Sequence, residues 1–174
     1  MTEQVILVDQ NDLPIGHMEK MEAHVKGELH RAFSIFIFNF NNELLLQQRA
    51  LDKYHSGGLW TNTCCSHQRV GESNMDAANR RLFEEMGMRC NLEYGFNFIY
   101  KAHFESGLIE HEFDHVFFGI SDDLPVINKD EVESYRYVNL ASLKLDIDSH
   151  PEMYTPWLKI CLDKVILRTE MDSK

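Results

Sequence analysis

The sequence predicts a single domain, residues 1–174, in which strands and helices form an α/β or α+β sandwich. Apolar runs rich in β-forming residues come in pairs separated by short turns, a pattern typical of antiparallel hairpins. Two segments with helical periodicity accompany these runs, one in the middle of the chain and one near its end. The content of 44% hydrophobic and 26% charged residues is typical of a globular domain with a buried core.

The first half of the chain is expected to begin with strands. Gln4–Val8 is a short apolar run, and residues 11–16 concentrate Asn, Asp, Pro and Gly, which favours a turn. Two longer β-rich runs, 31–38 and 43–48, are separated by the Asn-Phe-Asn-Asn segment 39–42. This spacing predicts a hairpin.

The second half contains three further runs of the same kind. Residues 96–104 and 109–120 are joined by Glu-Ser-Gly at 105–107, so we expect a second hairpin. Another strand is expected near 132–138. Because hairpins pair antiparallel and helices must cover a sheet, these runs support the sandwich.

The first helix is expected over residues 74–86. Ser73 or Asn74 can cap its N-terminus, and Gly87 can end it in a left-handed conformation. At 100° per residue one stripe of this helix is apolar, formed by Met75, Ala78, Leu82 and Met86. Arg80 and Glu84 lie opposite the stripe and are expected to face solvent.

The second helix is expected to follow Pro156. Its buried side is predicted to contain Trp157, Leu158, Cys161, Leu162, Val165 and Ile166. The last residues, Glu170–Lys174, are expected to form a loose tail.

The charge balance excludes several partners. Seventeen Lys and Arg residues against 28 Asp and Glu residues give a net charge of −11, whereas nucleic acids and anionic membranes attract a basic surface. The N-terminus does not resemble a signal peptide, and the most apolar segment is too short to span a bilayer. Four cysteines, two of them adjacent, are a poor disulfide framework, so we expect a reduced, cytoplasmic protein.

Two short segments contain the residues best suited to chemistry, Trp60–His67 (W-T-N-T-C-C-S-H) and Glu110-His111-Glu112. In extended chain alternate side chains share a face, so Cys65 would accompany His67, and Glu110 would accompany Glu112. Together with His24 and His30 upstream, these residues can form a metal site with imidazole and carboxylate ligands and a cysteine beside it. This combination indicates proton-transfer chemistry.

A further pattern lies on the first helix. Glu72, followed after seven residues by Arg80-Arg81-Leu82-Phe83-Glu84-Glu85-Met86-Gly87-Met88, resembles the Nudix box, G-x5-E-x7-R-E-U-x-E-E-x-G-U, where U is apolar. Ser66 replaces the leading glycine, and Arg81 replaces a glutamate that holds a divalent ion in Nudix hydrolases. The resemblance implies an α/β/α sandwich with a mixed β-sheet. The exchange implies direct contact with phosphate and loss of hydrolysis, although Arg81 and Glu85 alone would suggest a surface salt bridge.

A Nudix-like chain with these two segments resembles the type 1 isopentenyl-diphosphate Δ-isomerases from Val5 to the last helix. The resemblance implies that a double bond moves through a carbocation-like state. Cys65 and Glu112 match the proton-transfer residues on opposite faces of the alkene, in an unassigned order. Tyr100 matches the tyrosine that hydrogen-bonds the carboxylate, and Trp157 matches the indole that covers the cation.

The same resemblance implies the ligands. A five-ligand site for Mn²⁺ or Zn²⁺ is matched by His24, His30, His67, Glu110 and Glu112. Mg²⁺ would arrive with the diphosphate and be held by Glu85 and the backbone of Cys65. The small-molecule diphosphate would contact four cations, Lys20, Arg49, Lys53 and Arg81. The resemblance does not fix the oligomeric state.

Other readings compete with these assignments. Taken alone, Trp157 would be a core residue and Cys65 an inert buried thiol, and we expect Cys64 to pack in the core. The remaining histidines are expected to be surface or structural residues, namely His17, His55, His103, His111, His115 and His150. The rival functions are a Nudix pyrophosphohydrolase, disfavoured by Arg81, and a non-catalytic diphosphate sensor, which would need no acid–base pair.

Overall fold

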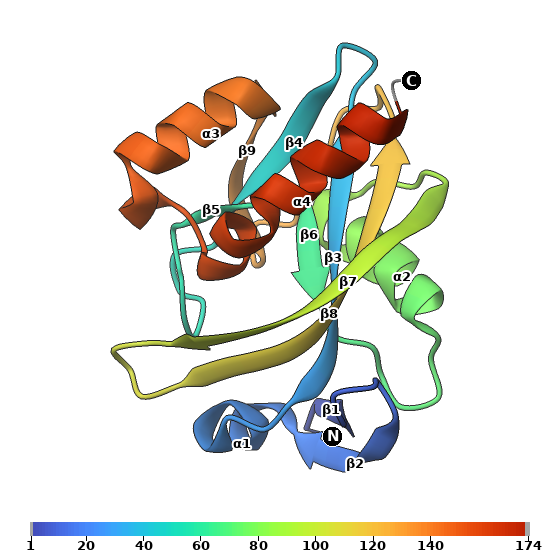
Figure 1. Ribbon diagram of the computed structural model, residues 1–174, viewed down its shortest axis with the longest axis vertical. Coiled ribbons are helices and arrows are strands. Elements are labelled where there is room, and N and C mark those ends of the chain that lie inside the picture. Colours follow the sequence, from blue (N-terminus) through green and yellow to red (C-terminus); the bar gives the residue numbers. More distant parts are fainter. Residues whose placement is uncertain (1, 173–174) are drawn as a thin grey trace.

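A mixed β-sheet with helices on both faces forms the framework of the protein (Figure 1). The computed structural model describes residues 2–172. The strands are β1 (Gln4–Val8), β2 (Pro14–Glu19), β3 (His30–Phe38), β4 (Glu43–Arg49), β5 (Trp60–Thr61), β6 (Cys64–Ser66), β7 (Leu92–His103), β8 (Ile109–Ile120) and β9 (Val132–Asn139). The helices are α1 (Lys20–Lys26), α2 (Asn74–Met86), α3 (Leu140–Ser149), the 3₁₀ turn η1 (Pro151–Met153) and α4 (Pro156–Asp172).

Strand β3 is the central strand of the sheet. It pairs in parallel with β8 from His30↔Glu112 to Phe38↔Ile120, and antiparallel with β6 on its other side. Strands β7 and β8 form a long antiparallel hairpin. The link between β3 and β4 is a single pair, Phe38↔Leu44, so β4 and its partners β5 and β9 form a second wing. The sheet is therefore mixed, as expected.

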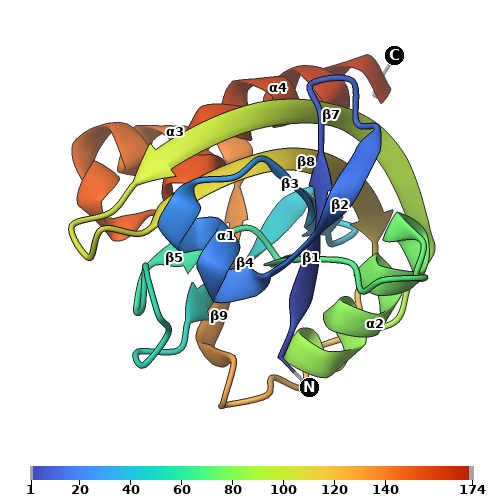
Figure 2. The ribbon, with the colours of Figure 1, turned by 90° about the horizontal axis from the view of Figure 1, so that it is seen from below.

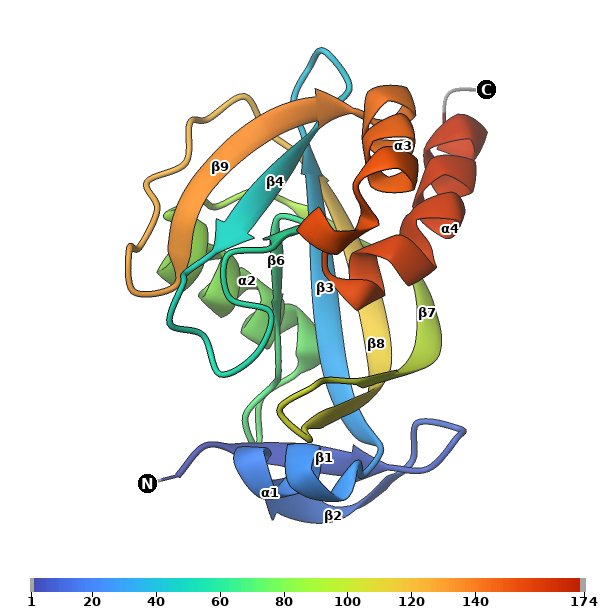
Figure 3. The same cartoon turned by 90° about the vertical axis from the view of Figure 1, so that its left-hand side faces the viewer.

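The helices form the outer layers (Figure 3). Helix α2 covers one face, where Phe33 and Ile35 of β3 pack with Leu82. Helices α3 and α4 cover the other face, where Phe36 of β3 packs with Leu158. Burial on both faces explains the continuous apolar sequence of β3. Within the described residues, no helix is long and apolar enough to cross a membrane.

The hairpin β1–β2 and helix α1 lie together at one end of the molecule (Figure 3), the end that faces the viewer in Figure 2. Helix α1 has only seven residues, and the side chain of Glu19 caps its N-terminus by accepting from the amide of Glu22. Gly27 ends the helix with a φ of 68°, in the left-handed region that favours glycine. This short helix brings Lys20 and His24 close to the first residues of β3 and β8.

Most expected elements are confirmed, including the β7–β8 hairpin, the strand near 132–138, and helix α2 with Ser73 as its N-cap and Gly87 after it. The hairpin expected from 31–38 and 43–48 pairs only next to its turn, at Phe38↔Leu44. Two expectations were wrong. The turn occupies residues 9–12, and β2 already begins at Pro14, because Asp9 and Leu13 close the turn by backbone hydrogen bonding. The tail expected from Glu170 is helical as far as Asp172, and the remainder lies outside the described residues.

Candidate active site

A pocket opens where the end of the sheet meets α1, α2 and the start of α4. Residues from eight parts of the chain line it: Lys20, Gln47, Arg49, Lys53, Tyr54, Cys65, Ser66, His67, Arg81, Glu85, Tyr100, Glu110, Glu112 and Trp157. All but two of the site residues expected from the sequence are in this set. The other two, His24 and His30, lie directly against it in a cluster with His67 and Glu112.

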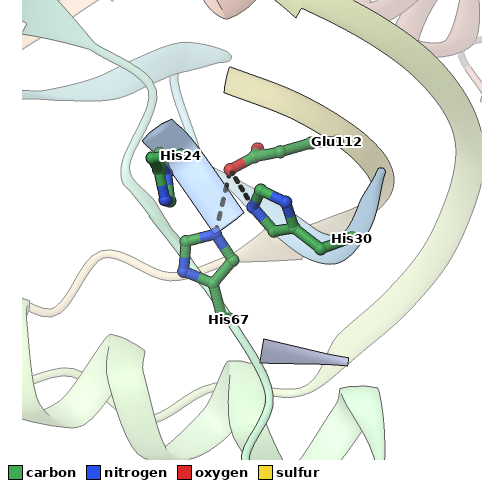
Figure 4. Close-up of side chains that lie close together, drawn as sticks. All are labelled: His24, His30, His67 and Glu112. Atoms are coloured by element: carbon green, nitrogen blue, oxygen red, sulfur yellow. Dashed lines mark hydrogen bonds and ion pairs between the residues drawn. The ribbon is translucent and has the colours of Figure 1, made fainter. Parts of the chain in front are cut away.

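The side chains of the histidine cluster lie close together (Figure 4), and all of them are buried. One side-chain nitrogen or oxygen from each of His24, His30, His67 and Glu112 lies within 4.8 Å of the others. Glu112 Oε1 is 2.9 Å from His67 Nε2 and 3.5 Å from His30 Nε2. The four residues come from α1, β3, the end of β6 and β8, so the tertiary fold assembles the cluster.

The second ring nitrogen of two of these histidines fixes the tautomer. His24 Nδ1 lies 2.6 Å from the carbonyl of Lys20, and His30 Nδ1 lies 2.8 Å from the carbonyl of Glu28. Because a carbonyl only accepts, each Nδ1 carries the proton, which leaves a lone pair on Nε2. Both Nε2 atoms are buried without a hydrogen-bond partner. Buried lone pairs beside carboxylates are the donor set that a divalent transition metal requires, so the residues fit such an ion.

His55, expected to be a surface or structural residue, is buried and not on the surface. It is only 5% exposed, and its Nε2 lies 2.8 Å from Glu110 Oε1. His24, His55 and Glu110 form a second group of potential ligands that shares His24 with the first. By contrast, His17, His103 and His150 are exposed, as expected.

Tyr100 connects the two carboxylates of β8. Its hydroxyl lies 2.6 Å from Glu112 Oε2 and 2.8 Å from Glu110 Oε2. Burial, followed by the charges of Glu110 and Glu112, raises the pKa of Tyr100 well above its usual value. The hydroxyl therefore stays protonated and donates a hydrogen bond to these carboxylates.

Burial and neighbouring charges shift the pKa values of the pocket side chains in opposite directions. Burial alone raises the pKa of Glu112, but the neighbouring His30 and His67 rings outweigh it and hold that pKa well below its usual value. Burial lowers the pKa of His67 to about 4. Burial raises the pKa of Cys65 far above its usual range, and Arg49 opposes this only in part. The metal-free pocket thus contains a protonated thiol and an ionised Glu112 carboxylate.

The side-chain amide of Asn62 connects the segments around Cys65. Asn62 Nδ2 donates to the carbonyls of Ile35 and Cys64 at 3.1 and 2.9 Å. Its Oδ1 accepts from Trp157 Nε1 at 3.2 Å, so Asn62 links the segment with Cys65 to the first turn of α4. The sequence placed Asn62 in the distinctive segment, but nothing in the pattern indicated this linking role.

Four cations line the pocket, and three of them pair with carboxylates. Lys20 pairs with Glu3 at 3.2 Å, Lys53 pairs with Glu131, and Arg81 Nη2 lies 2.6 Å from Glu85 Oε1. Arg49 differs, because no ion pair to it occurs within residues 2–172, although it is only 8% exposed. Its Nη2 donates to the carbonyl of His55 at 3.2 Å, and its Nε has no partner there.

This fold and site match known proteins. A family model described as "NUDIX domain" matches residues 28–158. Among solved structures, DR0079 from Deinococcus radiodurans superimposes with a TM-score of 0.78 at 16% identity, over 93% of this chain and 98% of that one. A MutT NUDIX hydrolase from Burkholderia pseudomallei gives a TM-score of 0.63 at 18% identity, over 79% and 98% of the two chains. These matches define a NUDIX-domain protein and confirm the expected fold.

Curated relatives show to which family of NUDIX-domain proteins the chain belongs. The chain is 56% identical over 166 residues to "Isopentenyl-diphosphate Delta-isomerase 2" of Aromatoleum aromaticum, covering 95% of this chain and 88% of that protein. It is 54% identical to "Isopentenyl-diphosphate Delta-isomerase" of Pectobacterium atrosepticum, covering 93% and 90%. The chain therefore belongs to the isopentenyl-diphosphate Delta-isomerase family of NUDIX-domain proteins, which confirms the resemblance drawn from the sequence.

Proposed function

We propose that this protein interconverts isopentenyl diphosphate and dimethylallyl diphosphate. The observation that carries the proposal is the shared pocket of Cys65 and Glu112, which are protonated and ionised respectively. An isomerase that moves a double bond needs one group that gives a proton and another that takes one. Family membership supports the same activity.

The diphosphate end of the substrate would bind among the four cations. Arg49 supports this best, because a buried guanidinium without a carboxylate partner within residues 2–172 can satisfy its remaining donors with phosphate oxygens. Lys20, Lys53 and Arg81 line the same pocket and can exchange their present partners for the substrate. Mg²⁺ arriving with the diphosphate would be held by Glu85 and the backbone of Cys65.

The isoprenoid end would lie between Cys65 and Glu112. A proton is added to the terminal alkene carbon and another is removed from the allylic carbon, so the composition of the substrate does not change. Tyr100 would orient Glu112 through its hydrogen bond, and the Trp157 indole would stabilise the positive charge that develops on carbon. Burial of these groups keeps water from the cation.

A Mn²⁺ or Zn²⁺ ion would be held by the three histidines and two glutamates, since the buried lone pairs described above suit it. When bound, it supplies positive charge that holds the Glu110 and Glu112 carboxylates in place. The backbone carbonyls of Lys20 and Glu28 hold His24 and His30 in the tautomers that direct a lone pair toward the ion.

Arg81 argues against hydrolysis of nucleoside diphosphate derivatives. It stands where the Nudix box has a glutamate, and it contacts Glu84 and Glu85 at 2.8 and 2.6 Å. A cation in this position repels the divalent ions that the box would otherwise collect. A non-catalytic sensor is disfavoured because it would not require Cys65 and Glu112 in one pocket.

The proposal also includes a cytoplasmic location. Cys65 must remain a free thiol to transfer protons, and all four cysteines of the chain are free. A reducing compartment maintains this state.

The test is incubation of the purified protein with isopentenyl diphosphate and Mg²⁺ in D₂O, followed by NMR. We expect dimethylallyl diphosphate to form with deuterium in its methyl groups. Phosphate release from a panel of nucleoside diphosphate derivatives is measured in parallel. Release of phosphate without isomerisation would overturn the proposal in favour of the hydrolase.

A further inference from the structure

His55 has the surroundings of a site residue, although it lies in a loop. The loop 50–59 connects β4 to β5 and also contains Lys53. The His55 ring stacks on Phe104 with centroids 4.4 Å apart and an interplanar angle of 13°, and Tyr54 packs edge-on against it. These contacts hold the ring in one orientation, with Nε2 directed toward Glu110.

The approach of His55 to Glu110 is close without being a hydrogen bond. Nε2 lies 2.8 Å from Oε1, yet the atom has no hydrogen-bond partner. The other ring nitrogen, Nδ1, lies 3.2 Å from Ser56 Oγ and can donate to it. A lone pair on Nε2 would then face a carboxylate oxygen, an arrangement that a cation between them stabilises.

The distances match those between the ligands of one ion. Bonds of about 2.1 Å place neighbouring ligand atoms about 3 Å apart in an octahedral shell and opposite ones about 4.2 Å apart. Nε2 of His55 is 2.8 Å from Glu110 Oε1, and Nε2 of His24 is 4.0 Å from the same oxygen. His24, His55 and Glu110 thus have the spacing of ligands around a single cation.

We propose that His55 is a further ligand of the divalent metal ion, contributed by the loop 50–59, so that metal binding fixes the loop that presents Lys53 to the diphosphate. The proposal rests on the metal centre and the diphosphate site described under the proposed function. Arg49 strengthens the coupling, because its guanidinium donates to the carbonyl of His55 while its backbone closes the loop through Leu59 and Gly58. Lys53 and Arg49 would therefore be fully positioned only when the ion is bound.

The test compares three proteins stripped of metal by chelator and titrated with Mn²⁺: wild type, His55→Phe and His103→Phe. Phenylalanine keeps the stack on Phe104 but offers no nitrogen, and His103 is an exposed histidine that serves as the matched control. We expect Mn²⁺ affinity to fall about 10–100-fold in His55→Phe and to stay unchanged in His103→Phe. X-ray absorption should count one imidazole fewer around Mn²⁺ in His55→Phe.

The loop gives a second measurement that does not depend on activity. Amide hydrogen exchange over residues 50–59 should slow when Mn²⁺ is added to wild type and should stay fast in His55→Phe. His55→Gln, which retains a donor for Glu110, provides the same readouts if the Phe variant does not fold. Equal affinity, equal imidazole counts and equal loop protection in wild type and the variants would overturn the proposal. Failure of the wild type to bind Mn²⁺ would instead overturn the metal centre itself.

Discussion

Cys64 and Cys65 are consecutive residues of β6 whose side chains lie on opposite faces of the sheet. Cys64 is completely buried under α2, in the cluster that includes Ala78 and Leu82. Cys65 lines the pocket with Arg49 and Glu112. Strand alternation therefore gives two adjacent thiols different surroundings, so one serves as a control for the other.

Cys65→Ala should abolish isomerisation while leaving the fold and diphosphate binding nearly intact. Removing one acid–base group costs on the order of 10²–10⁴-fold in rate. Cys64→Ala should lower the free energy of unfolding by about 1 kcal/mol, because it leaves a small cavity, and should affect turnover far less. Turnover is followed by NMR and stability by urea unfolding. Equal losses of activity in the two variants would show that the assignment of Cys65 is wrong.

The sequence predicted the long, strongly patterned elements, because periodicity over ten or more residues reflects burial directly. It missed α1 and α3 for a physical reason. Helix α1 has seven residues, and only Leu143 and Ile147 of α3 are buried, so neither shows a full apolar stripe. These elements form because the rest of the fold packs against them, which local sequence does not report.

The same distinction applies to the site. The spacing of Cys65 with His67 and of Glu110 with Glu112 follows from strand alternation, and all four residues do line one pocket. His55 could not be recognised in this way, because a loop has no periodicity and its approach to Glu110 depends on tertiary contacts. The family resemblance did not indicate His55 as a site residue either.

A transition metal should survive dialysis of the wild-type protein and be lost from His67→Ala. His67 supplies one of the buried donors, and its removal opens the ligand shell and disturbs Cys65 two residues away. Elemental analysis after purification without chelator measures the ion per chain, and His103→Ala is the exposed control. Wild-type protein without any stoichiometric Mn or Zn would count against the centre.

The metal-free protein should lose stability as the pH falls below neutrality. Burial lowers the pKa of His24 below its ordinary value of 6.5 and lowers the pKa of His67 to about 4. As the pH falls from 6.5 to about 4, His24 and His67 take up protons in the unfolded chain before they do so in the folded chain. Unfolding therefore becomes more favourable as the pH falls. His30 opposes this in part, because burial lowers its pKa but the neighbouring Glu112 carboxylate outweighs burial and raises it.

Urea unfolding at about pH 7 and about pH 5, with chelator present, measures this effect. The wild type should lose more unfolding free energy between the two pH values than His67→Phe, in which the largest of these titrations is absent. A parallel loss in both proteins would mean that His67 does not titrate as its burial implies.

Arg81→Glu, which restores the glutamate of the Nudix box, should destroy isomerase activity without creating a hydrolase. Arg81 contacts Glu85 at 2.6 Å and Glu131 at 3.2 Å, so the change removes a cation from the pocket and adds a third carboxylate beside these two. Loss of a charge-assisted hydrogen bond costs roughly 1.5–3 kcal/mol, and like-charge repulsion adds to it. Binding of the diphosphate should weaken by well over tenfold, mostly as a raised KM.

Arg80→Glu is the matched control, since Arg80 lies on the same helix but pairs with Glu72 at 2.6 Å and is absent from the pocket lining. Isomerisation and phosphate release are measured for both variants, with circular dichroism as the check on folding. Hydrolysis should not appear, because a hydrolase must also position an attacking water, and this pocket surrounds the reacting carbons with buried Trp157, Tyr100 and Glu112. An isomerase unaffected by Arg81→Glu, or a robust new hydrolase, would show that Arg81 does not bind the diphosphate.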